Sequence, residues 1–406
     1  MTSHYDAIVV GARCAGAPTA MLLARAGHRV VLVDRARFPS DTLSTHFIHQ
    51  PGVARLKRWG LLEEVAASGC SPVRTLGLDL GDLVLSGSPA PADDVADAYC
   101  VRRTVLDHIG VEAAARAGAE VREGFAVREL TFDGDRVTGI RGRGQDGGTV
   151  TERARIVIGA DGVASPVARA VGAPAYDVHP TLTCAYYAYW SGVELEGAEL
   201  YPRPGRMIIA APTNDGLVFS IAYWPRAEFG RVRTDVERHF EEALSLVPGL
   251  AERLRRGERV ERFRGTGRLP NFRRRPHGDG WALVGDAGYH KDPILALGIS
   301  DAYRDAELLA EAVDAGLSGR RRLADALAGY ERRRNELSAQ GYEMTIRFAG
   351  LGPPPPEMQA LMAAVRDDPE QTGRLLGTFV GTWSAEEFFA PENVARIMGA
   401  SVPEEV

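Results

Sequence analysis

The sequence predicts an α/β protein in which a lobe built on a parallel sheet carries an inserted antiparallel sheet. Two observations predict the first lobe: short apolar runs alternate with helical segments, and glycine-rich turns follow these runs. A third predicts the insertion, because residues 180–224 change to long alternating stretches such as "TLTCAYYAYWSGV" and "GLVFSIAYWP". The chain has 406 residues. Because single cores stop growing near roughly 250 to 300 residues, two or more lobes are expected.

Composition and charge exclude several classes of protein. With 45% hydrophobic residues, 25% charged residues and a net charge of -6, the chain is neither disordered nor a polyanion binder, so no nucleic-acid partner is expected. The four cysteines are widely spaced and match no zinc pattern, which predicts reduced thiols and no metal. No uncharged apolar run approaches the roughly 18 residues that a membrane span needs. We therefore expect a cytoplasmic monomer or homodimer without a membrane span.

The first element is a strand, helix and strand unit at the N-terminus. Residues 7–10 form a short apolar run, residues 14–26 show helical periodicity, and residues 29–33 form a second buried run. This unit closes within about 30 residues, as a dinucleotide-binding βαβ unit requires. The sequence therefore predicts a nucleotide cofactor at the turn between the first strand and the helix.

That turn carries an altered glycine motif. Gly11 and Gly16 stand in the GxGxxG frame, but Arg13 replaces the second glycine, and Asp34 follows the second strand where a carboxylate can accept ribose hydroxyls. An arginine pointing outward from the turn need not collide with the ligand, and its guanidinium could lie near the phosphates or the ribose. The alternative is an ordinary turn between a strand and a helix.

The remaining elements follow in order. Helices are predicted over residues 51–67, 104–117, 301–315 and 323–348, a meander over 120–151, and buried strands over 156–158 and 280–284. After "GPPPPE" a short helical tail is expected. The predicted cofactor-binding domain comprises residues 1–75, 97–178 and 270–349, the substrate-binding sheet domain comprises 76–96 and 179–269, and the helical tail comprises 350–406.

Two further motifs support the first. They are "GADGVASPVARAVG" at residues 159–172 and "GWALVGDAGYHKDPILALGISDAYRDAELL" at residues 280–309. Over residues 5–345 the three motifs, in this order, resemble the class A flavoprotein monooxygenases of the para-hydroxybenzoate hydroxylase fold. The wider group includes flavin-dependent halogenases and geranylgeranyl reductases. This resemblance implies a Rossmann-like, GR2-type lobe that binds FAD.

The resemblance also implies which residues bind the cofactor. Asp161 would hold the pyrophosphate through water, Asp286 the ribityl chain, and Arg103 (or its neighbour Arg102) a phosphate. The full predicted set is Gly11, Arg13, Cys14, Ala15, Gly16, Asp34, Arg35, Arg103, Val127, Asp161, Asp286, Pro293, Gly298 and Ile299. Gly298 precedes a helix whose free N–H groups can face the flavin pyrimidine ring. Simpler alternatives are a helix-capping role for Asp286 and a surface salt bridge for Arg103.

This sequence departs from the family pattern at several positions. Ala168 stands where the family has an arginine, which comes one residue late as Arg169. In the third motif Ala296 and Leu297 replace a Gly-Gln pair, and Tyr289 stands where the family often has histidine. The change at position 168 leaves the contact with the nicotinamide nucleotide open, and the changes in the third motif leave a reductase function open.

By resemblance, NAD(P)H would reduce the flavin, and O2 activated at flavin C4a would oxygenate an aromatic or polyketide-like small molecule in specialised metabolism. The candidate catalytic side chains are His46 and His49, in the loop "SDTLSTHFIHQ", and Tyr289. A loop histidine can equally be only solvated. The inserted sheet is rich in aromatic residues, of which alternation turns about half toward the substrate: Tyr186, Tyr187, Tyr189, Trp190, Phe219, Tyr223 and Trp224.

Other functions remain open on this sequence. A reductase of the geranylgeranyl type would use the same fold to reduce double bonds without inserting oxygen. A flavin-dependent halogenase would be expected to show a WxWxIP stretch and a suitably placed lysine, and the nearest segment, "SIAYWP", lacks the paired tryptophans. An NAD-dependent dehydrogenase would not need the second and third motifs. A non-catalytic flavin-binding protein would bind FAD without consuming NAD(P)H.

Overall fold

A mostly parallel sheet forms the centre of the first lobe. The computed structural model describes residues 4–144 and 147–399. Eight strands make this sheet, in the order β20-β21-β11-β1-β2-β8 with β10 and β9 continuing from β11. Their bounds are β1 (His4–Val10), β2 (Val30–Asp34), β8 (Glu120–Glu123), β9 (Ala126–Asp133), β10 (Arg136–Arg143), β11 (Thr149–Gly159), β20 (His277–Gly278) and β21 (Trp281–Leu283). Strands β21, β11, β1, β2 and β8 run parallel, so their carboxyl ends share one edge.

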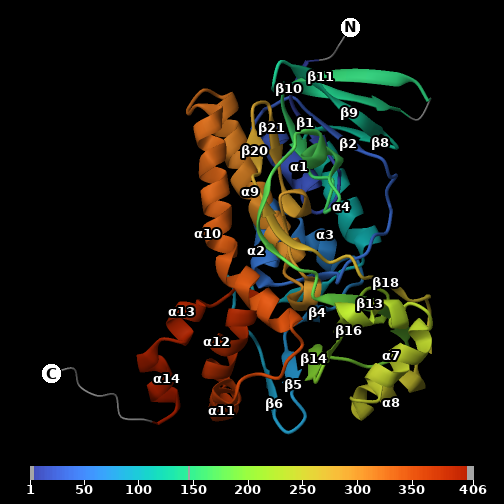
Figure 1. Cartoon of the computed structure of the whole chain (residues 1–406), viewed down its shortest axis with the longest axis vertical. Helices are drawn as coiled ribbons and strands as arrows, with labels where there is room; N and C mark the ends of the chain where they lie inside the picture. The colour runs from blue at the N-terminus through green and yellow to red at the C-terminus, as the bar shows by residue number, and fades with distance from the viewer. Residues whose placement is uncertain (1–3, 145–146, 400–406) are drawn as a thin grey trace, which may run out of the picture.

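Both faces of this sheet are covered (Figure 1). The helices are α1 (Gly16–Arg25), α2 (Gln50–Trp59), α3 (Leu62–Ala66), α4 (Arg103–Arg116), α5 (Pro166–Ala170), α9 (Gly298–Leu317) and α10 (Leu323–Ala349). Ala7 and Val9 of β1 join the core shared with α1, α4 and α9, whereas Ile8 and Val10 join the core beneath the β9–β11 meander. A strand buried on both faces explains the continuous apolar run in the sequence. Gly60, at φ +75°, ends α2 and divides the predicted 51–67 helix in two.

The inserted sheet has eight strands in the order β17-β13-β16-β15-β14-β5-β6, with β18 paired to β13. They are β5 (Leu76–Asp79), β6 (Val84–Gly87), β13 (Thr183–Ser191), β14 (Ala198–Arg203), β15 (Arg206–Pro212), β16 (Val218–Pro225), β17 (Glu258–Arg259) and β18 (Arg264–Thr266). Alternation sorts the aromatic side chains between two cores. Tyr187, Tyr189, Phe219 and Tyr223 lie in the core that includes η3 (Pro293–Leu295), and Tyr186, Trp190 and Trp224 lie against the opposite core.

The outer face of the inserted sheet packs against a helical layer. The helices are η1 (Arg226–Glu228), α6 (Phe229–Val232), α7 (Val236–Leu244) and α8 (Pro248–Arg256). Phe240 of α7 is fully buried, with its ring centroid 5.7 Å from that of Trp190 and 4.7 Å from that of Phe263. This layer therefore fixes the back of the sheet, away from the first lobe.

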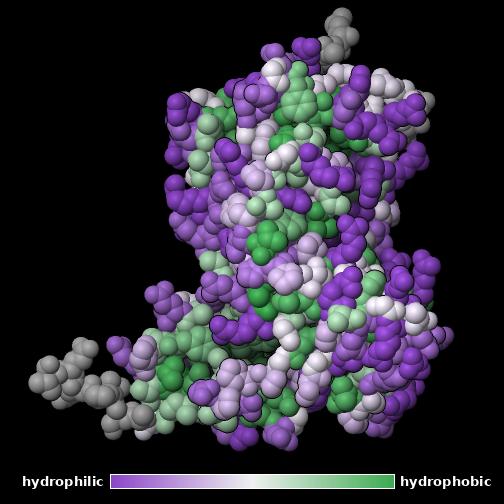
Figure 2. All heavy atoms as spheres, viewed as in Figure 1, coloured by the Kyte–Doolittle hydropathy of each residue, from purple (hydrophilic) through white to green (hydrophobic). Residues whose placement is uncertain are grey.

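Two three-stranded sheets and the C-terminal helices complete the fold. The small sheets contain β3 (Phe47–Ile48), β7 (Ala98–Cys100) and β4 (Pro72–Val73), and β12 (Ala175–His179), β19 (Asn271–Arg274) and β22 (Tyr289–His290). The remaining elements are η2 (Gly285–Ala287), α11 (Pro356–Val365), α12 (Pro369–Val380), α13 (Ala385–Phe388) and α14 (Pro391–Ile397). Helices α11 to α13 share their core with the inserted sheet. Figure 2 shows hydrophobic surface over these C-terminal helices, at the lower left.

The structure confirms the predicted α/β class, and the sheet inserted into the first lobe is mostly antiparallel, although β14 and β5 pair parallel. Strand β11 is longer than the predicted 156–158 run, because its first half pairs antiparallel with β10 at the surface. The division into three domains stays a proposal, and its ends at residues 1–3 and 400–406 lie outside the described residues, as do residues 145–146 of the meander. Within the described residues, no helix is long and apolar enough to cross a membrane.

Replacing Phe240 by alanine should destabilise the inserted lobe. The lost aromatic contacts and the cavity left behind should lower the free energy of unfolding by about 3 to 5 kcal/mol. Chemical denaturation followed by tryptophan fluorescence measures this loss, since Trp190 and Trp224 lie in the same core. Phe132, which is 48% exposed, supplies the matched control: Phe132→Ala should change stability by less than about 0.5 kcal/mol. Equal losses in both variants would contradict the packing role of Phe240.

Candidate active site

The glycine turn after β1 packs against the end of β11. Gly11 has φ +102°, and a Cβ there would lie 2.4 Å from the carbonyl oxygen of Ala160. A Cβ at Gly16 would lie 1.7 Å from the carbonyl oxygen of Gly11. Helix α1 then begins without a side-chain cap, so its first N–H groups and positive dipole end are suited to an anionic ligand. The two glycines are therefore required by the backbone of the turn itself.

Asp34 ends β2 beside this turn. Its carboxylate accepts hydrogen bonds from the backbone N–H of Ala12 and of Ala36, both at 2.7 Å. Each carboxylate oxygen keeps a second acceptor position, so the pair can still accept two ribose hydroxyls. Arg35 is exposed next to it, and Val127 of β9 is half-buried. The arrangement fits the adenosine end of a dinucleotide.

Arg13 and Arg103 share one buried carboxylate. Arg13 Nη1 donates to Asp107 Oδ2 at 2.6 Å, and Arg103 Nε and Nη2 donate to Asp107 Oδ1 at 3.1 and 2.9 Å. The Cys14 thiol also donates to Asp107 Oδ1, at 3.3 Å, and burial raises the pKa of this thiol. Arg13 was predicted near the phosphates or the ribose and Arg103 at a phosphate, but here both donate hydrogen bonds to Asp107. Phosphate contact stays a proposal. Arg102 instead pairs with Glu261.

The polar side chains of the second motif form hydrogen bonds within the motif. Asp161 accepts the Ser165 hydroxyl at 2.5 Å and the backbone N–H of Val167 at 2.9 Å, which fixes the start of α5. Burial raises the pKa of Asp161. Arg169, in place of the family's arginine at position 168, is exposed. The serine and aspartate of the motif thus shape the loop, and a water-mediated contact of Asp161 with pyrophosphate stays a proposal.

The third motif places an exposed carboxylate and an open helix end in one segment. Asp286 lies exposed in η2, just after β21, and Pro293 lies half-buried in η3. Gly298 begins α9, is exposed, and has open space where a Cβ would stand, while Ile299 beside it is buried. Because α9 has no side-chain cap, its first N–H groups are free of side-chain acceptors. They point out of the helix end and favour negative charge on a ring placed there.

Tyr289 is committed to a buried charge network. Its hydroxyl accepts a hydrogen bond from Lys291 Nζ at 3.0 Å, and burial raises the pKa of Tyr289. Lys291 also pairs with Asp301, which accepts from Arg304 Nη1 at 2.8 Å. The tyrosine therefore anchors the first turn of α9, and its predicted catalytic role receives no support from this geometry.

His46 is fully buried at the start of β3, with φ +62°. Its Nε2 hydrogen-bonds the Tyr189 hydroxyl at 2.8 Å, whereas its Nδ1 is buried without a partner among the described residues. Burial, followed by the nearby charges of Arg103, Arg102 and Arg264, lowers its pKa well below the ordinary value. His46 is therefore a neutral imidazole with one unsatisfied nitrogen.

His49 is also buried, and its side chain holds two segments of the backbone together. Its Nε2–H donates to the backbone carbonyl of Leu295 in η3, at 3.0 Å. Burial lowers its pKa to about 4. The imidazole therefore ties α2 to the third motif as a neutral donor, and neither histidine is the solvated loop residue that the alternative prediction described.

An apolar cavity lies between the third motif, the inner face of the inserted sheet and the C-terminal helices. The space in it that is open to the centre of a water molecule measures about 50 Å³. Its lining, in which only Thr45 and His49 carry polar side-chain atoms, consists of Thr45, Phe47, His49, Leu76, Leu78, Ala198, Leu200, Ile209, Ala211, Phe219, Ile221, Ile294, Leu295, Ala296, Phe348, Leu376, Phe379 and Val380. The His46 ring lies 5.3 Å from the ring of Phe219, between centroids. Among the described residues, the Tyr187 hydroxyl is also buried without a hydrogen-bond partner, and the Tyr187 ring lies 5.5 Å from that of His46.

The glycine turn, the Asp34 carboxylate beside it and the open helix end fit FAD, and together with the apolar cavity they define a flavin-dependent oxidoreductase. Comparison with known proteins agrees. Residues 4–345 match the family model described as "FAD binding domain", and the chain belongs to this family of FAD-dependent enzymes. Within the described residues, no group of acidic, histidine or cysteine side chains could hold a metal ion.

Relatives within the group catalyse different reactions. The chain is 30% identical to digeranylgeranylglycerophospholipid reductase 1 of Methanopyrus kandleri over 74% of its own length and 77% of the relative's. It is 26% identical to 6-methylpretetramide 4-monooxygenase of Streptomyces rimosus over 85% and 84%. The myxobacterial chondrochloren halogenase CndH superimposes with a TM-score of 0.80 at 22% identity, covering 99% and 98%, which shows the common fold alone.

Several site residues were not predicted from the sequence. Asp107 follows Arg103 by four residues on one helix, a spacing that signals an ion pair and could have been noticed. Tyr187 was named only among seven aromatic residues. The cavity residues of α12, such as Leu376 and Phe379, carried no signal, because an apolar helical face near the end of a chain is equally typical of ordinary packing.

Gly11→Ala should abolish FAD binding, because its Cβ would collide with the backbone of Ala160 and displace the turn. Gly27 is the matched control: it has φ +88° but nothing within 4 Å of a Cβ. Gly27→Ala carries only the cost of a left-handed alanine, about 1 kcal/mol. The ratio of flavin absorbance to protein absorbance after purification reports the difference. A yellow Gly11→Ala protein with full occupancy would show that the turn tolerates a side chain.

His49 should make the fold sensitive to acid. Between pH 6.5 and 4 the unfolded chain binds a proton at this histidine that the folded protein does not, so stability falls as pH falls through that range, by up to about 3 kcal/mol. His49→Gln keeps an N–H donor for Leu295 but does not titrate. Between pH 7.5 and pH 4.5, the denaturation midpoint should therefore decrease more in the wild type than in the variant. Parallel pH dependence in the two proteins would contradict a buried neutral His49.

Proposed function

We propose that the protein is an FAD-dependent monooxygenase that uses NAD(P)H and O2 to hydroxylate an apolar aromatic or polyketide-like molecule. The observation that carries this proposal is the apolar cavity, whose wall includes Ile294, Leu295 and Ala296 of the third motif. Bound FAD would accept hydride from NAD(P)H and activate O2 for oxygen transfer. The residues Gly11, Gly16, Asp34, Asp286 and the start of α9 would hold the cofactor.

The chain's own contribution is to exclude water and to orient the substrate. The cavity lining exposes no polar side chain beyond Thr45 and His49, which favours a flat apolar body and limits the loss of activated oxygen to water. His46 and Tyr187 do not line the cavity themselves, but their rings lie 5.3 and 5.2 Å from the ring of Phe219, which does. Among the described residues, His46 Nδ1 and the Tyr187 hydroxyl are buried without a hydrogen-bond partner. We infer that they hydrogen-bond an oxygen of the substrate. Because buried surroundings and three arginines disfavour the imidazolium, His46 suits an orienting role better than that of a proton acceptor.

A reductase of the geranylgeranyl type is the second candidate. The cavity would suit an isoprenoid chain as well as an aromatic ring, and several relatives carry that activity in their names. A halogenase is less well supported by the positions of the two lysines. Lys57 is exposed on α2 and pairs with Asp94, and Lys291 is buried against Asp301, so neither lines the cavity.

Rapid mixing separates the two candidates. The holoprotein is reduced without oxygen and mixed with oxygenated buffer while absorbance spectra are recorded. A transient spectrum distinct from both reduced and oxidised flavin, together with 18O from 18O2 in the product of an aromatic substrate, is expected. Direct return of oxidised flavin, with substrates that gain two hydrogens and no 18O, would assign the protein to the reductases.

Leu376→Trp should block the cavity from the side of α12 without disturbing the cofactor. N-phenyl-1-naphthylamine, a dye that fluoresces in apolar surroundings, should bind the wild-type holoprotein and bind this variant at least tenfold more weakly. Leu337→Trp on α10 is the matched control, since Leu337 is 43% exposed and lies outside the cavity. Unchanged dye binding in Leu376→Trp, or no binding to the wild type, would show that the cavity does not receive apolar ligands.

A further inference from the structure

We propose that Arg13 is a positioning residue that clamps the 38–46 loop against the cofactor-binding turn. This loop (residues 38–46) connects β2 and β3 and ends at His46. The arginine would thus replace the motif's second glycine for a purpose that glycine cannot serve. The proposal concerns cofactor binding and loop order, and it does not depend on which reaction the protein catalyses.

Arg13 makes several contacts with the loop at once. Nη1 donates to the Ser40 carbonyl at 3.1 Å, and Nη2 donates to the Ser40 hydroxyl at 3.0 Å and to the Asp41 carbonyl at 3.4 Å. The guanidinium carbon also lies 5.4 Å from the ring centroid of Phe38. A planar group with five donors can hold a carboxylate on one side and a bent backbone on the other. The ion pair with Asp107 fixes the guanidinium, and the loop hydrogen-bonds to its other side.

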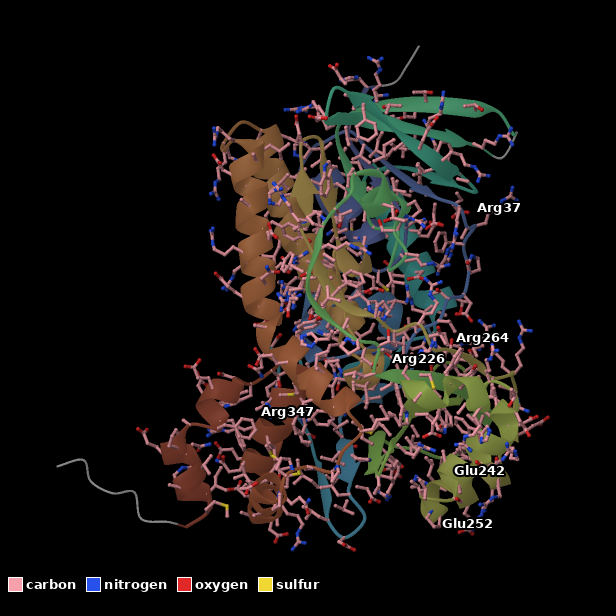
Figure 3. The ribbon with its side chains drawn as sticks, in the orientation of Figure 1. Arg37, Arg226, Glu242, Glu252, Arg264 and Arg347 are labelled. Atoms are coloured by element: carbon pink, nitrogen blue, oxygen red, sulfur yellow. The ribbon has the colours of Figure 1, made fainter. Side chains whose placement is uncertain are left out.

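The far side of the same loop is tied to the inserted lobe. Asp41 Oδ2 accepts from Arg264 Nη1 at 2.6 Å, and Asp41 Oδ1 accepts the backbone N–H of Thr42 at 2.8 Å. Figure 3 shows Arg37, the residue just before the loop, above Arg264 of the inserted lobe. Arg13 of the first lobe and Arg264 of the inserted lobe therefore bind neighbouring parts of the same loop.

Loss of Arg13 should loosen the loop rather than unfold the first lobe. Arg103 still donates twice to Asp107 and the Cys14 thiol once, so the buried carboxylate keeps a counter-charge. The Ser40 and Asp41 carbonyls would instead lose their donors from the turn. Because His46 ends this loop in a left-handed conformation, its unsatisfied nitrogen would lose its fixed direction as well.

Hydrogen–deuterium exchange and FAD affinity test the clamp together. In Arg13→Gly, the peptide covering residues 38–46 should exchange at least tenfold faster than in the wild-type holoprotein, and the FAD dissociation constant, from flavin fluorescence quenching, should rise at least tenfold. Arg13→Lys should recover part of both, because one ammonium group can reach Asp107 or Ser40 but cannot span them. Arg25→Ala is the control: Arg25 donates to the Trp59 carbonyl at the other end of α1 and should change neither quantity.

Two outcomes would overturn the clamp. One is unchanged exchange of residues 38–46 in Arg13→Gly, and the other is tighter FAD binding, which would mean that the arginine only obstructs a motif built for glycine. Should Arg13→Gly not fold, Asp41→Asn weakens the Arg264 side without touching Asp107, and it should also speed exchange of the loop; unchanged exchange there would again contradict the proposal. Neither readout needs substrate or O2, so a failed hydroxylation assay leaves this test intact.

Discussion

The parallel pairing of β2, β1, β11 and β21 is the constraint on which the site depends. Residues far apart in the sequence reach one sheet edge because the strands that carry them end there: Gly11 after β1, Asp34 on β2, Ala160 after β11 and Asp286 after β21. The contact of Gly11 with Ala160 is so close that the first two motifs are one packed unit. The proposed cofactor site therefore depends on the sheet edge as a whole, and no single motif forms it alone.

The substrate side is built on a different principle. Its walls come from three sources: the third motif, the inner face of the inserted sheet and α12. Of the two polar side chains in its lining, His49 is committed to the Leu295 carbonyl. His46 Nδ1 and the Tyr187 hydroxyl, beside Phe219, are buried without a hydrogen-bond partner among the described residues. An apolar space with a small polar group beside it selects by shape first and by one or two hydrogen bonds afterwards.

The sequence predicted much of the fold because its signals are local. Apolar runs located β1, β2 and β21, two of them before glycine turns, and alternation located the inserted sheet. Errors occurred where tertiary structure decides: Gly60 divides a helix that periodicity joins, and β11 extends into a surface ribbon. At the site, backbone roles such as those of Gly11 were readable from a motif. The partner of Arg13 was not, because Asp107 reaches it from a helix more than ninety positions away. Nor could periodicity show that His46 is buried, since loops carry no repeating pattern.

Because α12 supplies one wall of the cavity, the shape of the cavity and the three cofactor motifs depend on different parts of the chain. Leu376, Phe379 and Val380 line the cavity from a helix that contributes nothing to the three cofactor motifs. Mutations there can reshape the cavity while the sheet edge that carries the glycine turn and Asp34 stays as it is. If the cavity receives the substrate as proposed, the range of substrates can change through substitutions in one peripheral helix, without variants that no longer bind the cofactor.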